Sequence, residues 1–365
     1  DKDSLVSFIK DGSISFDEMI KAGLHQSMQE EISNSLKAVE VIKDNLQNRQ
    51  EICAAIERGD YSVVEIKSML LKNEISETDL LSYTSFSKDL IAKIKNYIKV
   101  QTPFNDWENL PPLKPKRTDV YFFGQPGSGK SCVLASLFKY FSDNGLMQVD
   151  IDNLAGAQYL NLLKDEFEFG ILPDSTAEDG VNYIALNLRS IDNRNNWHPL
   201  NFIEMSGEHF NSAYRHGINS NNLGRKNFLT NDNQKIIFFV IDYDMHMKRK
   251  LSQGGISSQS GMMVNILELL DKTGTLKKTQ AIYILLTKTD LFPAGVNRKT
   301  YADDFLKEYY LNFRENCIDK KRKHNDLFKV LVFPYSIGEV KFQSILLSID
   351  SLSPAYVTEA IRNHS

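Results

Sequence analysis

Residues 124 to 131 read GQPGSGKS, which places a glycine, a lysine and a serine side by side. This spacing matches GxxxxGK[ST], a loop whose glycines let backbone N–H groups converge on phosphate oxygens. In such a loop Lys130 supplies a positive charge to the β- and γ-phosphates, and the Ser131 hydroxyl binds Mg²⁺. The loop residues predicted to bind a nucleotide are Gly124, Pro126, Gly127, Ser128, Gly129, Lys130, Ser131 and Cys132.

The flanking segments are the ones that this loop requires. Val120–Phe123 is a short apolar run, and Val133–Leu137 continues at helical spacing. They predict a strand, the loop and then a helix whose N-terminus attracts phosphate. A purely structural glycine loop is the alternative. At this helix start the Cys132 thiol is either redox-sensitive, through a lowered pKa, or a small packing residue.

The rest of this half alternates short apolar runs with longer amphipathic stretches, which is typical of an α/β sheet. A loop near residues 192–197 would join the first two of the later runs as a hairpin. The runs expected to be strands are Val181–Leu188, Leu200–Met205, Lys235–Asp242, Ala281–Leu286 and Phe328–Phe333.

Four further segments complete the set of candidate site residues. Glu204-Met205-Ser206-Gly207 ends one predicted strand and is followed by Glu208 and His209, and Thr287-Lys288-Thr289-Asp290 ends another. Ser336-Ile337-Gly338 follows the last strand, and Thr176 precedes the hairpin. Each has a plainer interpretation: Glu204 as a surface carboxylate, Thr287 or Asp290 as a helix N-cap, and Ser336 as part of a turn.

With these motifs, residues 118 to 365 resemble the P-loop GTPases of the translation-factor and Ras-like (TRAFAC) class. They look most like divergent bacterial members such as the double-GTPase proteins. The resemblance implies a Ras-like α/β P-loop fold, with a mainly parallel sheet and one antiparallel hairpin strand. It also implies Mg²⁺ and GTP as ligands.

The resemblance also implies roles for single residues. Ser131, Thr176 and, through water, Glu204 would hold Mg²⁺, and the N–H of Gly207 would meet the γ-phosphate. Lys288 would lie along the guanine, and Asp290 would accept hydrogen bonds from its N1 and N2. Thr287 belongs to the same motif, and Ser336 and Ile337 match, faintly, the loop that contacts the guanine O6.

The sequence departs from the family pattern at three of these positions. Glu204 replaces an aspartate, and Thr287 replaces the commoner asparagine. Glu208 lies where Ras-like members carry a water-orienting glutamine, and a carboxylate there is also repelled by the γ-phosphate. The predicted catalytic residues are therefore Lys130, Glu208 and, as a second candidate for positioning water, His209, and we expect slow hydrolysis.

Two other functions remain open. The strand Lys235–Asp242 also ends in an acid, so the chain is alternatively a P-loop ATPase with Asp242 as the Walker B residue that holds Mg²⁺. It is also compatible with a nucleotide-gated interaction module that binds without turnover.

The first third of the chain has a different character. Prolines are absent before residue 103, and apolar residues recur at helical spacing, as in Ile20, Leu24, Met28 and Ile32. Ser15, Ser62 and Ser76 each precede an acid by three positions, which predicts capping boxes at three helix starts. The predicted organisation is an all-α domain at 1–102, a proline-rich linker at 103–117 and the P-loop domain at 118–365. The helical domain would bind a protein partner, or else the two loops that the resemblance identifies as switches, one around Thr176 and one after Gly207, would do so.

Composition limits the partners further. The 365 residues carry 43 Lys+Arg and 47 Asp+Glu, and a net charge of −4 argues against bulk binding to nucleic acid. Three separated cysteines suit a reducing cytoplasm rather than a disulfide framework or a zinc site. The longest apolar runs are too short to predict a membrane span.

Overall fold

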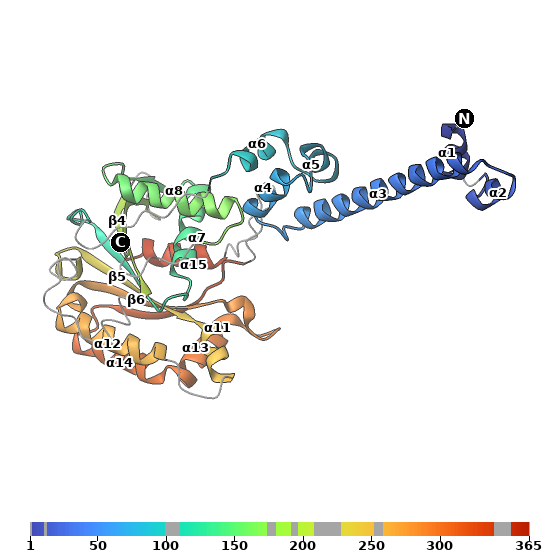
Figure 1. The fold of residues 1–365 in the computed structure, drawn as a ribbon. Helices are drawn as coiled ribbons and strands as arrows, with labels where there is room; N and C mark the ends of the chain where they lie inside the picture. Colours follow the sequence, from blue (N-terminus) through green and yellow to red (C-terminus); the bar gives the residue numbers. More distant parts are fainter. Residues whose placement is uncertain are drawn as a thin grey trace. The chain divides into compact units, whose positions relative to one another are not determined.

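The computed structural model contains a mixed sheet flanked by helices (Figure 1). It describes residues 2–10, 13–98, 110–173, 180–190, 196–207, 228–251, 258–338 and 352–364. The strands within these residues are β1 (Thr118–Phe123), β2 (Met147–Val149), β3 (Val181–Arg189), β4 (Trp197–Met205), β5 (Gln234–Asp242), β6 (Thr279–Thr287) and β7 (Lys329–Pro334).

The sheet has the strand order β2-β3-β4-β1-β5-β6-β7. β3 pairs antiparallel with both β2 and β4, and every other described pair is parallel. The predicted fold class, a mainly parallel sheet with one antiparallel hairpin strand, is therefore confirmed. The sequence patterns missed β2, because it is only three residues long and none of them is buried.

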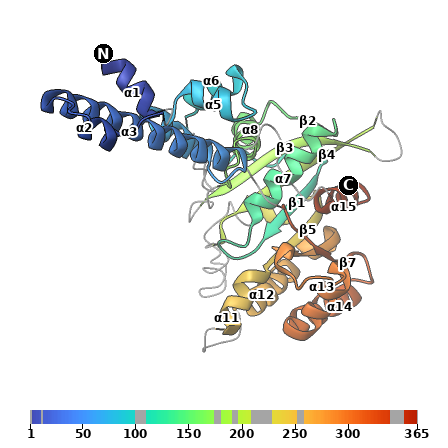
Figure 2. The ribbon, with the colours of Figure 1, turned by 90° about the vertical axis from the view of Figure 1, so that its right-hand side faces the viewer.

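Helices cover both faces of this sheet, as Figure 2 shows from a second side. One apolar core joins the sheet to α7 (Lys130–Asp143), α8 (Leu154–Glu168) and α15 (Leu352–Arg362). The opposite core joins it to α12 (Ser258–Lys272), α13 (Arg298–Tyr309) and α14 (Leu311–Lys323). All six residues of β1 are buried, and the last four, Val120–Phe123, form a continuous apolar run rather than an alternating one.

Three shorter elements lie next to strand ends. α11 (Tyr243–Leu251) follows β5 directly, and the 3₁₀ turn η2 (Thr289–Leu291) follows β6 after one residue. The other 3₁₀ turn, η1 (Thr275–Lys278), comes immediately before β6. β5 and β6 thus pass into helical turns at the same edge of the sheet, because the two strands are parallel.

The chain separates into two compact units, Asp1–Tyr97 and Ile98–Ser365. The first contains α1 (Lys2–Lys10), α2 (Phe16–Lys21), α3 (Gln26–Glu57), α4 (Val63–Leu71), α5 (Glu77–Tyr83) and α6 (Lys88–Asn96). Residues 99–109, which include much of the predicted linker, lie outside the described residues. The predicted boundaries at 102 and 117 stay a prediction.

The three predicted capping boxes are confirmed. Ser15, Ser62 and Ser76 each accept a hydrogen bond from the N3 backbone N–H, and the N3 acid accepts one from the N-cap N–H. The apolar stripe from residue 20 to 32 is not one helix, however. α2 ends at Lys21 and α3 begins at Gln26, because Gly23 takes the left-handed conformation (φ +91°) between them.

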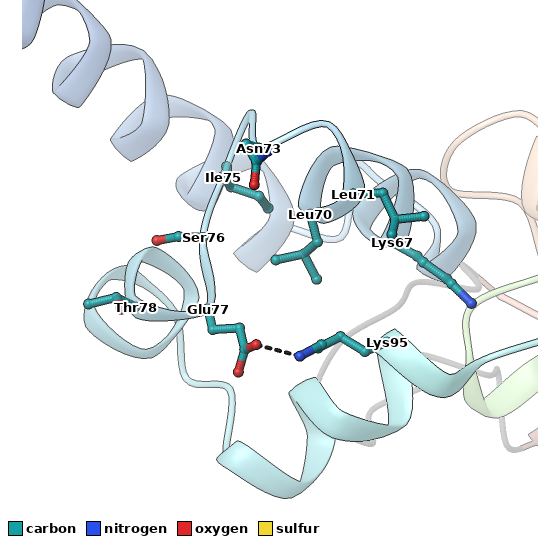
Figure 3. A pocket seen from close by; sticks show the side chains of 9 residues that line it. All are labelled: Lys67, Leu70, Leu71, Asn73, Ile75, Ser76, Glu77, Thr78 and Lys95. Carbon is teal, nitrogen blue, oxygen red and sulfur yellow. Dashed lines mark hydrogen bonds and ion pairs between the residues drawn. The ribbon is translucent and has the colours of Figure 1, made fainter.

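The helical unit carries a hollow of about 560 Å³ between α4, the start of α5 and α6 (Figure 3). An ion pair of 2.5 Å joins Glu77 to Lys95 at its edge. Leu71, which lines it, is 74% exposed. No helix in the described parts of the chain has both the length and the apolar composition needed to cross a membrane.

Candidate nucleotide-binding site

The predicted site residues that the structure describes belong to segments at one edge of the sheet. β1, β4, β5 and β6 are parallel neighbours, so their carboxyl ends lie together. The phosphate loop leaves β1 at this edge, and the three other strands end there at Met205, Asp242 and Thr287. In open α/β sheets, ligands bind outside the carboxyl ends of the strands.

The glycines of the phosphate loop are required by its geometry. Gly127 and Gly129 have φ values of +72° and +89°, which side chains with a Cβ rarely adopt. A Cβ on Gly124 would lie 2.7 Å from the carbonyl oxygen of Val240. α7 begins directly after the loop at Lys130, so its N-terminal N–H groups and positive dipole end border the loop.

Two polar side chains of the loop are buried. Lys130 is 6% exposed, and its Nζ donates to the carbonyl oxygens of Gly124 (2.9 Å) and Gln125 (3.1 Å). The hydroxyl of Ser128 is fully buried and has no hydrogen-bond partner within the described residues. A buried ammonium and an unsatisfied buried hydroxyl in the same loop suit a site that receives an anion.

The metal-binding residues predicted on β4 and α7 are in contact. The Ser131 hydroxyl donates to Glu204 Oε1 at 2.5 Å, and Glu204 is fully buried. A hydroxyl and a carboxylate are the oxygen ligands that Mg²⁺ uses together with phosphates. Within the described residues, no three or more His, Cys, Asp or Glu side chains are placed so that they could hold a metal ion. The donor set therefore fits a magnesium ion shared with a nucleotide, rather than an ion held by protein side chains alone.

The other oxygen of this carboxylate has partners that the sequence did not predict. Tyr159 on α8 donates its hydroxyl to Glu204 Oε2 at 2.6 Å, and Asn182 on β3 donates its amide at 3.4 Å. In the sequence, Tyr159 is one apolar position of an amphipathic helix 45 residues from Glu204. No local spacing signals this contact.

Gly207 lies against the phosphate loop. A Cβ added to Gly207 would lie 2.1 Å from the backbone nitrogen of Pro126. No side chain fits at that distance, so the segment after β4 approaches the loop this closely only with glycine.

The segment after β6 is fixed to the phosphate loop. The buried hydroxyl of Thr287 lies 2.9 Å from the carbonyl oxygen of Ser128 and 3.1 Å from that of Ile241, and can donate to either. Further along, Ser336 donates its hydroxyl to Asp290 Oδ1 at 3.0 Å. Thr287 can thus connect the segment after β6 to the phosphate loop, and Ser336 contacts Asp290; the base-binding role of these residues stays a prediction. Ile337 is partly buried against the core beside α7.

Lys288 makes a contact that bears on the alternative role of Asp242. Lys288 has the left-handed conformation (φ +59°), which is uncommon for a residue with a side chain. Its Nζ lies 2.9 Å from Asp242 Oδ2 and 3.6 Å from Asp244 Oδ2. Partial burial lowers the pKa of Lys288, but the hydrogen bond and charge of Asp242 outweigh it and raise the pKa above its usual value. Lys288 is therefore a cation, paired with the acid that ends β5.

Cys132 is partly buried and packs against the core that α7 and α8 form with the sheet. Burial, and next the charge of Glu204, raise its pKa to about 11. This direction favours the packing interpretation over a thiol activated by the helix N-terminus.

Three predicted site residues, Thr176, Glu208 and His209, lie outside the described residues. Their roles stay predictions.

No protein-family model and no curated protein matches the sequence. Several solved structures show a weak likeness, among them the following two. The signal recognition particle receptor SRb-GTP/SRX complex from Chaetomium thermophilum has 15% identity, with 67% of this chain and 99% of that chain covered and a TM-score of 0.37. Toc33 from Arabidopsis thaliana in complex with GDP and Mg²⁺ has 14% identity, with 68% and 84% covered and a TM-score of 0.34. Such low values assign neither a ligand nor an activity to this chain.

Proposed function

We propose that the chain binds GTP with Mg²⁺ at the phosphate loop, hydrolyses it slowly, and acts as a nucleotide-gated switch. The observation that supports this best is the connection between the loop and the predicted base segment. Thr287 joins that segment to the loop at Ser128, and Ser336 donates to Asp290.

Guanine specificity follows from the chemistry of Asp290. Guanine presents two adjacent donors, N1–H and N2–H, to a carboxylate, whereas adenine presents no such pair. The hydrogen bond from Ser336 occupies Oδ1 and limits rotation of the carboxylate. A charge-assisted hydrogen bond contributes about 1.5–3 kcal/mol, so two of them favour GTP over ATP by about 100-fold or more.

The phosphates would be bound by the loop and the start of α7. The N–H groups from Gly127 onward and the N-terminus of α7 favour negative charge. On binding, Lys130 would turn from the carbonyl oxygens of its own loop to the β- and γ-phosphates, which compensate its charge better. These donors would also stabilise the charge that develops during phosphoryl transfer.

Ser131 would hold Mg²⁺ directly, and Glu204 through water. Mg²⁺ supplies neutralisation of the charge on the β- and γ-phosphates. In the reaction, water attacks the γ-phosphorus in line with the leaving GDP, and inorganic phosphate and a proton are released. We assign the positioning of that water to Glu208, with His209 as the second candidate, and a further Mg²⁺ ligand to Thr176.

The ATPase alternative assigns Mg²⁺ to Asp242, and the contacts do not favour it. The hydroxyl of Ser131 contacts Glu204, while Asp242 Oδ2 faces the ammonium of Lys288. An oxygen already neutralised by a lysine is a poor ligand for a cation.

The test is competition of GTP against ATP for the purified chain, repeated with Asp290→Ala. We expect the wild type to prefer GTP by about 100-fold or more, and Asp290→Ala to lose that preference while it still binds triphosphate. Equal affinities of the wild type for both nucleotides would refute the guanine assignment. Single-turnover hydrolysis then separates an enzyme from a module that only binds.

The helical unit is the proposed partner-binding part, since the hollow between α4 and α6 presents the exposed Leu71. Crosslinking of GTP-loaded and GDP-loaded protein in cell extract, with Leu71→Asp, tests this. The matched control is Leu46→Asp on α3, where the leucine is 44% exposed and does not line the hollow. A partner that prefers the GTP form and is lost only in Leu71→Asp supports the switch. A partner lost equally in both variants contradicts it.

A further inference from the structure

The two carboxylate oxygens of Glu204 contact different parts of the fold. Oε1 accepts from Ser131 on the phosphate-loop side, at 2.5 Å. Oε2 accepts from Tyr159 at 2.6 Å and from Asn182 at 3.4 Å. Two hydroxyls thus bind opposite oxygens of one fully buried carboxylate, and they fix the plane in which it lies.

Tyr159 is itself fixed by its surroundings. It is 3% exposed and belongs to the apolar core formed by α7, α8 and the sheet. Its hydroxyl therefore donates to Glu204 Oε2, at 2.6 Å, from a buried position in the core. α8 lies close to β3 at Gly156. A Cβ at this position would lie 2.3 Å from the carbonyl oxygen of Tyr183, so the close approach requires glycine.

A glutamate needs this support more than an aspartate would. Its carboxylate stands on one more rotatable bond, so a free glutamate has more orientations to lose when it takes part in a metal site. The hydrogen bonds from Tyr159 and Asn182 remove that freedom before any ligand arrives, and they leave Oε1 turned toward Ser131. Residues that orient metal-binding groups in this way commonly affect metal affinity as much as some direct ligands do.

We propose that Tyr159, assisted by Asn182, is a positioning residue of the magnesium site, which holds Glu204 with one oxygen directed to Ser131. This inference rests on the proposed function, because it concerns the Mg²⁺ that accompanies the nucleotide. It adds a connection between the metal site and α8, an element that none of the site motifs includes.

The experiment is a Mg²⁺ titration of the binding of a fluorescent GTP analogue to the full chain. It compares the wild type, Tyr159→Phe and Asn182→Leu, and it measures both the Mg²⁺ midpoint and the nucleotide affinity at saturating Mg²⁺. The matched control is Tyr283→Phe, since the buried hydroxyl of Tyr283 donates to the carbonyl oxygen of Ala360 instead. Thermal unfolding of each variant confirms that it is folded.

Loss of a residue that orients a metal-binding side chain typically weakens metal affinity about 10–100-fold. We therefore expect the Mg²⁺ midpoint of Tyr159→Phe to rise by this factor. Its affinity at saturating Mg²⁺ should stay close to that of the wild type, and Tyr283→Phe should match the wild type in both values. Asn182→Leu should shift the midpoint in the same direction by less, because its hydrogen bond is longer.

A merely structural tyrosine gives a different result. It would lower thermal stability, or nucleotide affinity at saturating Mg²⁺, and leave the midpoint unchanged, and that outcome overturns the inference while the proposed function stands. Nucleotide binding by the wild type that does not depend on Mg²⁺ at all would overturn the proposed magnesium site, and this inference with it.

Discussion

Replacing Asp242 by asparagine separates the two roles that an acid beside the phosphate loop can have. Asp242 is 1% exposed, and its Oδ1 accepts the backbone N–H of Met245 at 2.9 Å while Oδ2 pairs with Lys288. Asparagine keeps the first contact and replaces the second oxygen by an amide that cannot pair with an ammonium. The substitution therefore breaks this ion pair and leaves Lys288 its longer contact to Asp244, at 3.6 Å.

The size of the effect follows from the conformational freedom that the Lys288 side chain then loses when GTP binds. Lys288 is 39% exposed, so once released it is solvated and mobile rather than stranded. Ordering one such side chain costs about 0.5–1.5 kcal/mol, which corresponds to GTP affinity about two- to twelve-fold weaker at saturating Mg²⁺. The Mg²⁺ midpoint should not change, because Glu204 and Ser131 are untouched.

The assay is the same Mg²⁺ titration with a fluorescent GTP analogue. Asp244→Asn is the matched control, because Asp244 is 3.6 Å from Lys288 Nζ and pairs more closely with Lys248, at 2.7 Å. We expect it to weaken GTP binding less than Asp242→Asn does. If Asp242→Asn instead raises the Mg²⁺ midpoint and leaves affinity at saturating Mg²⁺ unchanged, Asp242 is the metal-associated acid and the ATPase alternative is correct.

Two other predictions concern the stability of the site and of the sheet's far helices. Thr287→Val removes the hydroxyl that contacts the carbonyl oxygen of Ser128, so we expect a free energy of unfolding lower by about 1–3 kcal/mol and weaker GTP binding. Thr287→Ser should retain the stability and the GTP affinity of the wild type. Equal free energies of unfolding for the two variants in denaturant titrations would contradict this. Burial raises the pKa of Asp271, but hydrogen bonds from the side chains of Lys323, Lys320 and His324 outweigh that and hold the pKa well below its usual range. Because the folded pKa is lowered, the stabilisation is present above the unfolded pKa of about 4 and is lost as the pH falls through it toward the folded value. Unfolding of the wild type and Asp271→Asn should thus differ at pH 7 and converge under acid conditions, and a difference that stays constant down to pH 3 would be evidence against the ion pairs.

The sequence was sufficient for the parts of the fold that are buried on both faces. Continuous apolar runs mark β1, β5 and β6, because both sides of these strands contact helices. β2 was missed, since a three-residue edge strand with no buried residue has no comparable pattern. The helical stripe from 20 to 32 misled for a related reason: apolar spacing persists across the turn at Gly23, although the chain direction changes there.

The candidate site divides in the same way. Its backbone requirements are local, so the glycines and Lys130 could be predicted from spacing alone. The contacts of Glu204 and Asp242 could not, because Tyr159 and Lys288 approach them across 45 or 46 positions of the chain. Two acids at strand ends look alike in a sequence, and only their contacts show which of them lies beside Ser131.

These partners also predict what happens when Glu204 is replaced by the shorter aspartate. An aspartate is shorter by about 1.5 Å, one carbon–carbon bond, and so cannot keep contacts of 2.5 Å to Ser131 and 2.6 Å to Tyr159 at once. Tyr159 is anchored in the core, so the shorter side chain would have to leave one of the two buried hydroxyls unpaired. Glu204→Asp should therefore raise the Mg²⁺ midpoint rather than lower it. A lower midpoint would mean that Glu204 is a poor substitute for aspartate, and that Tyr159 is not its matched partner.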